Sequence, residues 1–166
     1  MTLNSIAIFV SVLTVVLFGL IAGFFYAYSV DVMRGLDLII PGEAIHAMQG
    51  INTAVRNPVF FITFFMTPVV AIIAAVIFYF NGNSASALWL AAAAIIYLAA
   101  AFAPTAMINV PMNEALASLN IDAASSEAKT IWADYSARWT FWNTVRTLAS
   151  TISLAASAMA LVFISR

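Results

Sequence analysis

Four long apolar stretches occupy most of this chain, and nearly all of its charged residues lie in two of the segments between them. The stretches lie at residues 6–30, 59–80, 85–108 and 139–164. A bilayer core about 30 Å thick needs about 20 apolar residues per helix, so each stretch is long enough to span it. An even number of spans places both termini on one side and the polar connections, 31–57 and 109–138, on the other. The sequence therefore predicts one transmembrane domain, residues 1–166, with a single elaborated face.

The composition supports an all-α integral membrane four-helix bundle. The 166 residues are 64% hydrophobic and 8% charged, whereas a soluble domain carries about 25% charged residues. A net charge of −1 gives no electrostatic basis for binding nucleic acid. The chain has no cysteine and a single histidine, His46, so one copy cannot supply a thiolate centre or a three-histidine zinc site. We expect a lipid bilayer as its surroundings, no metal site and no nucleic-acid partner.

The cationic residues predict the orientation in the membrane. Apart from Arg166, every lysine and arginine lies in the two polar connections or just inside the fourth stretch. Lysine and arginine are enriched in cytoplasmic loops. We therefore expect a multi-pass protein with the polar connections in the cytoplasm and both termini outside.

The first polar connection contains a short helical pattern. Pro41-Gly42 marks a turn, and residues 43–56 follow with helical periodicity. This segment is too short to span a bilayer. We expect a short interfacial helix between the first and second spans, packed on the bundle, with His46 and Gln49 sharing one face with Arg56.

Asparagine, proline and glycine residues predict where the spans begin, bend, turn and pack closely. Asn57-Pro58 is a strong helix start, and Pro68 predicts a kink within the second span. The short turn at residues 81–84 predicts that the second and third spans are antiparallel neighbours. Gly19 and Gly23 permit close helix packing, either within the bundle or at a homodimer seam.

The fourth span carries an arginine about two turns inside the apolar stretch. A charged side chain in lipid is costly, so Arg146 should face the bundle interior or extend to the membrane interface. Asn143 and Trp139 share its helical face, which favours the interior.

The connection-side ends of the helices bring together one imidazole, several amides, cations and aromatic rings. Such a set suits a flat, partly apolar ligand with oxygen substituents, because rings stack on aromatics and arginine stabilises a phenolate or enolate. We predict catalytic roles for His46 and Arg146. The predicted substrate-binding residues are Tyr26, Met33, Gln49, Asn52, Asn109, Asn113, Trp139 and Asn143. A structural alternative exists for each: the histidine as a hydrogen-bonded structural residue, the arginine in an ion pair, the asparagines as caps of bent helices.

Four segments resemble a known family. They are FFYAYSVDVMRGL at the end of the first span, AMQGIN after it, NVPMNEAL after the third span and WTFWNTVRT opening the fourth. The chain resembles the anthrone-oxygenase-like family of small four-helix membrane proteins, most of whose bacterial members have no assigned function. The resemblance implies oxidation of anthrones to anthraquinones without a metal, flavin or other cofactor, and it fits a bacterial cytoplasmic membrane. It points to Met33, Gln49, Asn52, Asn109, Pro111, Asn113, Trp139, Asn143 and Arg146.

Two functional hypotheses follow. In the first, the protein is a cofactor-independent oxygenase or oxidoreductase acting on a lipophilic phenolic or quinone-like substrate, with His46 as base and Arg146, Asn143 and Asn113 holding the anion. In the second, it is a non-catalytic membrane subunit or scaffold that binds a lipid, a quinone or a larger protein complex. A homo-oligomer is compatible with either.

Overall fold

The computed structural model describes residues 3–122 and 125–164. Two residues of the expected second connection, Ala123 and Ala124, and the cation at position 166 lie outside this part. Four helices are long and apolar enough to cross a membrane, which confirms the expected all-α integral membrane bundle. The main bundle helices are α1 (Leu3–Ala27), α4 (Pro58–Phe80), α5 (Ser84–Tyr97) and α7 (Ser126–Val162). Because α1 and α5 each contact both α4 and α7, the helices follow the order α1, α4, α5, α7 around the bundle.

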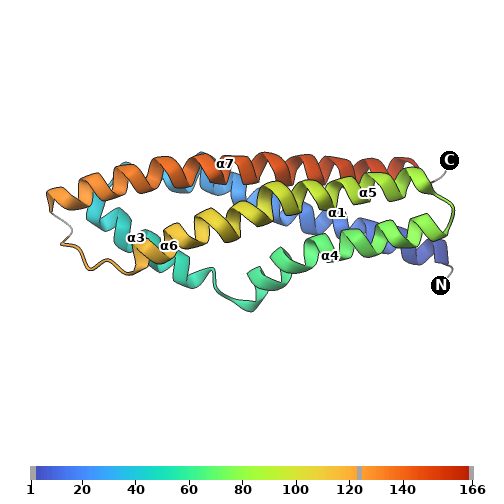
Figure 1. Cartoon of the computed structure of the whole chain (residues 1–166), viewed down its shortest axis with the longest axis horizontal. Helices are drawn as coiled ribbons and strands as arrows, with labels where there is room; N and C mark the ends of the chain where they lie inside the picture. Colours follow the sequence, from blue (N-terminus) through green and yellow to red (C-terminus); the bar gives the residue numbers. More distant parts are fainter. Residues whose placement is uncertain (1–2, 123–124, 165–166) are drawn as a thin grey trace.

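The two ends of the bundle differ (Figure 1). The first turns of α1, the last turns of α7 and the turn between α4 and α5 lie at one end, while α3 (Pro41–Ala54) and α6 (Val110–Ala117) lie at the other. Gly82 in the α4–α5 turn has a φ of 79°, a left-handed conformation that glycine adopts without strain. The α4–α5 turn therefore makes antiparallel neighbours of its two helices, as expected.

The helices run well beyond the length that a bilayer needs. At 37 residues, α7 is about 55 Å long, against a bilayer core of about 30 Å. The first helix continues through the π-helical turn η1 (Tyr28–Val32) into α2 (Met33–Leu36). The third continues through η2 (Leu98–Phe102) and η3 (Thr105–Asn109) into α6. The connection end is therefore largely a helical extension of the bundle, and much of the expected connection 109–138 is helix.

A separate apolar core holds this extension together. Helix α3 contacts α6 and α7, and residues including Met33, Ile45, Met48, Leu116 and Trp132 are buried between them. The expected short helix between the first and second spans is thus present and packs on the bundle.

Two polar side chains fasten the extension. The Gln49 amide nitrogen donates to the backbone carbonyls of Leu116 and Leu119 at 2.8 and 3.0 Å, which ties α3 to the end of α6. The Asp37 carboxylate accepts from Trp132 Nε1 at 2.9 Å and from Ser136 Oγ at 2.7 Å, which ties the end of α2 to α7.

Proline sets the local structure of α4. The Asn57 side chain accepts from the backbone N–H of Phe60 at 3.1 Å, and Pro58 occupies the first turn, as the sequence predicts. Pro68 inside the helix has no N–H to donate to the carbonyl of Phe64, four residues earlier. The Tyr97 hydroxyl on α5 donates to that carbonyl at 3.0 Å. The tyrosine thus satisfies the group that proline leaves free and fixes α4 against α5.

The two glycines of α1 differ in their surroundings. A Cβ added at Gly19 would lie 3.9 Å from Leu154 Cδ1 on α7, whereas one added at Gly23 would meet nothing within 4 Å among the described residues outside its own helix. Gly19 therefore lies at the α1–α7 contact within the bundle. The homo-oligomer stays a prediction.

Candidate ligand cavity

A cavity of about 500 Å³ lies where α4 begins, at the junction between the spanning bundle and the helical extension. Its walls come from α1 and η1, the end of α3, the start of α4, the π-helical turns η2 and η3, α6 and α7. About half of the lining residues are aromatic: Phe24, Phe25, Tyr28, Phe60, Phe61, Phe64, Phe65, Phe102 and Trp139. Walls of this kind suit a flat apolar ligand, because aromatic rings pack against one another at their faces and edges.

Arg146 brings a positive charge into this aromatic cavity. The side chain is 4% exposed and donates from Nη1 to Thr105 Oγ1 at 3.2 Å and from Nη2 to Asn143 Oδ1 at 2.9 Å. Its Cζ lies 4.5 Å from the centroid of the Phe25 ring and 5.1 Å from that of Trp139. Both distances are within the range of cation–π attraction.

No anion balances this charge in the described part of the chain. The one ion pair there joins Arg56 and Glu114, and Arg146 Nε has no hydrogen-bond partner. A buried charge without a partner is costly, both in proteins and in membranes. The wall of the cavity therefore contains a cation with no carboxylate partner in the described part of the chain, and an anionic ligand in the cavity would balance its charge.

Asn143 fixes the position of the Arg146 guanidinium by hydrogen bonds. Its Nδ2 donates to the backbone carbonyl of Phe25 and to Ser29 Oγ, both at 2.7 Å, while its Oδ1 accepts from Arg146. These bonds connect α7 to the end of the first helix. Because Asn143 is fully buried and does not line the cavity, it orients the arginine and is not itself positioned to contact a ligand.

The three π-helical turns lie around the cavity. Tyr28, Phe102, Thr105 and Asn109 all belong to them and all line the cavity. In η3 the N–H of Val110 bonds to the carbonyl of Thr105, five residues back, which widens the helix locally. Such π-helical insertions are often found at functional sites.

Asn109 is a second buried group with spare hydrogen-bonding capacity. Its Nδ2 donates to the Trp139 carbonyl at 3.4 Å, and its Oδ1 is buried and has no partner among the described residues. Asn109 Oδ1 and Arg146 Nε are thus buried polar atoms without a partner among the described residues, and both belong to residues that line the cavity.

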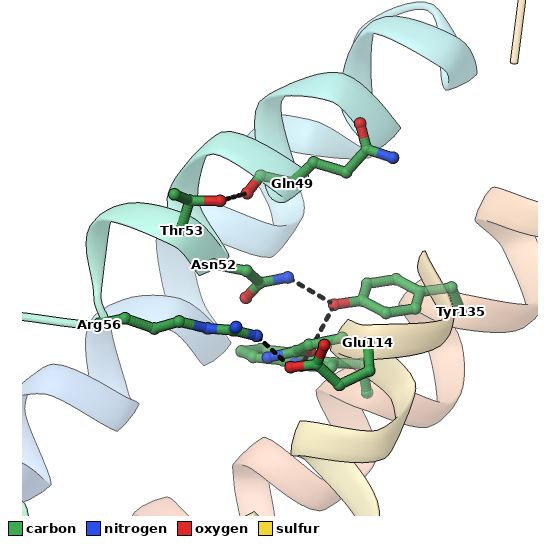
Figure 2. Close-up of polar contacts among 8 residues, drawn as sticks. Gln49, Asn52, Thr53, Arg56, Glu114 and Tyr135 are labelled. Carbon is green, nitrogen blue, oxygen red and sulfur yellow. Dashed lines mark hydrogen bonds and ion pairs between the residues drawn. The ribbon is translucent and has the colours of Figure 1, made fainter. Parts of the chain in front are cut away.

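The rim of the cavity has one charged and one apolar part. The Arg56 and Glu114 side chains pair across the rim between the end of α3 and α6, and both are about half exposed (Figure 2). On the outer surface of α4 and α6, Phe61, Phe65 and Val110 are 43%, 48% and 42% exposed. The apolar part suits a ligand that arrives from the bilayer.

The structure brings only some of the sequence-predicted residues together. Asn52, Asn109, Asn113, Trp139 and Arg146 line the cavity. The others lie elsewhere: Asn143 behind the arginine, Gln49 at the α3–α6 contact, Met33 in the core of the extension, and Tyr26 and His46 exposed.

Sequence reasoning missed the aromatic walls and the position of Glu114 at the cavity rim. Phe60 and Phe64, four residues apart just after the Asn57 cap, were a visible signal. On α3, Ile45, Met48 and Asn52 follow helical spacing and form the buried face, which leaves the histidine between them outside.

Fold and site together define a class: an integral membrane four-helix bundle with a partly aromatic cavity, lined by an arginine that has no carboxylate partner in the described part of the chain. The chain belongs to the anthrone oxygenase family, whose family model matches residues 59–156. The match runs from the first turn of α4 into α7, so it includes Arg146, Trp139 and Asn113 but not Asn52. No curated protein and no solved structure matches the chain.

Proposed function

We propose that this protein is a membrane-embedded oxygenase that binds a flat, lipophilic aromatic ketone or phenol in the cavity and oxidises it with dioxygen. The observation that carries the proposal is Arg146, a buried cation without a carboxylate partner in the described chain, facing aromatic walls. A substrate whose oxygen becomes anionic during the reaction would supply the missing negative charge. The family description points to anthrone as such a substrate.

The chemistry suits an anthrone-like CH₂ group that is activated by a ring carbonyl. Loss of one proton from this carbon places negative charge on the carbonyl oxygen, and Arg146 stabilises that enolate. The electron-rich anion reduces dioxygen and forms a carbon–oxygen bond, giving a hydroperoxide. Loss of water then leaves a second ketone. One CH₂ and one O₂ become one C=O and one H₂O, so the electrons balance without an external reductant.

The proton acceptor in this proposal is Glu114. Glu114 lines the cavity at the rim, and its half-exposed side chain lets the carboxylate exchange protons with water. Arg56 holds the carboxylate by an ion pair and keeps it directed across the rim (Figure 2). His46 is exposed and does not line the cavity, so it has no role in this proposal.

Oxygen consumption by the purified protein in lipid nanodiscs tests this proposal. Anthrone supplied to wild-type protein should give oxygen uptake and anthraquinone in equal amounts, above the spontaneous rate with empty nanodiscs. Arg146→Met should abolish the excess, and His46→Ala should retain it. Tight binding of anthrone without oxygen uptake would instead support the non-catalytic binding subunit.

A further inference from the structure

A chain of hydrogen bonds beside the cavity has a fixed direction. Trp139 Nε1 donates to Asn113 Oδ1 at 2.8 Å. An indole nitrogen can only donate, so the atom of the Asn113 amide that faces it must be the oxygen. The nitrogen of the same amide, Nδ2, is therefore turned away from the indole.

Tyr135 links the orientation of the Asn113 amide to that of the Asn52 amide. The Tyr135 hydroxyl donates to the same Asn113 oxygen at 2.9 Å, which commits its only proton. Its oxygen accepts from Asn52 Nδ2 at 3.5 Å, so the Asn52 amide is turned with its nitrogen towards the tyrosine (Figure 2). The Asn52 Oδ1 atom faces the other way. One donor-only indole thus sets the orientation of two amides.

Two atoms of this chain remain free. Neither Asn113 Nδ2 nor Asn52 Oδ1 has a hydrogen-bond partner among residues 3–122 and 125–164, and both residues line the cavity. We propose that they form a recognition pair, in which Asn52 Oδ1 accepts from a ligand hydroxyl and Asn113 Nδ2 donates to a separate ligand oxygen. Trp139 and Tyr135 act as positioning residues that fix which amide donates and which accepts. The inference rests on the proposed function in placing an aromatic ligand in this cavity.

Burial makes this pair selective. Asn52 is 5% exposed, so a bound ligand that offers no proton would leave its Oδ1 without a partner and without water. An unsatisfied buried acceptor costs more than a satisfied one contributes. Replacing a ligand hydroxyl by a methyl ether should therefore weaken binding about fivefold.

Three probes separate the two halves of the pair. These are 2-hydroxyanthraquinone, with a donor and acceptors, 2-methoxyanthraquinone, with acceptors only, and 2-hydroxyanthracene, with no ketone. Equilibrium dialysis against wild-type protein in nanodiscs, without oxygen, should show 2-hydroxyanthraquinone binding about fivefold tighter than either of the others.

Two variants test the positioning. Tyr135→Phe frees the Asn52 amide to rotate and to offer a ligand either its oxygen or its N–H. The affinity for 2-hydroxyanthraquinone should then stay the same and that for 2-methoxyanthraquinone should rise about fivefold, so that the preference falls to about one. Tyr79→Phe, at an exposed tyrosine on α4, is the matched control and should keep the preference. Asn113→Asp still accepts from Trp139 and Tyr135 but has no N–H, so both ketones should weaken about fivefold relative to 2-hydroxyanthracene.

The outcomes distinguish this inference from the proposed function. Equal affinity of wild-type protein for all three probes, or an unchanged preference in Tyr135→Phe, would overturn the inference and leave the ligand cavity intact. Binding of none of the three would overturn both. The predicted preference, lost in Tyr135→Phe and kept in Tyr79→Phe, would support both the pair and its positioning.

Discussion

Replacement of Arg146 by methionine should weaken binding of an anionic ligand without destabilising the fold. The arginine donates to Thr105 and Asn143 and packs on two rings, but no carboxylate in the described chain neutralises it. Its buried charge therefore destabilises the protein without a ligand and attracts an anionic ligand. Methionine has a similar length and no charge, and it adapts to irregular apolar spaces.

The substitution should lower the affinity for an anionic ligand but should not lower the stability of the protein. Hydrogen bonds to a charged group contribute about 1.5–3 kcal/mol, so the affinity for a phenolate should fall about tenfold to a hundredfold. Loss of the donor to Asn143 Oδ1 costs about 1–3 kcal/mol, and removal of an unpaired buried charge offsets this by a similar amount or more. The midpoint of unfolding should therefore stay the same or rise.

Two assays on the same preparations check this prediction. One measures binding of 2-hydroxyanthraquinone at a pH where its hydroxyl is ionised, and the other measures thermal unfolding in the same nanodiscs. Arg138→Met, at an exposed arginine on the same helix, is the matched control and should change neither value much. A variant at position 146 that loses several degrees of stability together with binding would refute the reasoning, because it would make the arginine a structural residue.

Four further outcomes are expected. Glu114→Gln should lower turnover about a hundredfold at unchanged substrate affinity, and His46→Ala should not; stopped-flow oxidation of anthrone measures both. Tyr97→Phe should lower the free energy of unfolding by about 1–2 kcal/mol. The loss should be smaller in a Pro68→Ala background, because the backbone N–H of residue 68 can then bond to the carbonyl of Phe64. A double-mutant cycle in denaturing detergent measures this coupling. Gln49→Ala should loosen α3 from α6 and raise the rate at which protease cleaves near residue 40, with no change in the proteolysis of the α4–α5 turn.

The spans and helix starts could be predicted from the sequence because they depend on local chemistry. Apolar length gives a span whatever surrounds it, and Asn57 followed by proline starts a helix without tertiary help. The arginine and Asn143 are three residues apart on one helix, so their shared face also follows from the sequence alone. These features concern one helix at a time.

The aromatic walls could not be predicted because α4 is apolar around its whole circumference. Phe60 lines the cavity and is half-buried, whereas its neighbour Phe61 is 43% exposed, and hydropathy does not distinguish them. A helix surrounded by lipid and protein has no polar face to mark its orientation. The choice depends on how α1, α5 and the π-helical turn η2 pack against α4.

The predicted role of His46 shows a different case, in which the prediction gave more weight to the chemistry of the imidazole than to the spacing of the apolar residues around it. Grouping the histidine with Gln49 by spacing ignored the apolar spacing of Ile45 and Met48, which decides the buried face of α3. That face carries Asn52 to the cavity and leaves the histidine exposed. Burial of apolar surface outweighs any preference of one polar residue.

The most direct test of the oxygenase account is oxidation of anthrone under ¹⁸O₂ by the protein in lipid nanodiscs. Wild-type protein should form anthraquinone with one ¹⁸O atom per molecule and consume one equivalent of dioxygen, whereas Arg146→Met should not. Product without the label, or labelled product formed equally fast by the variant, would contradict the oxygenase account.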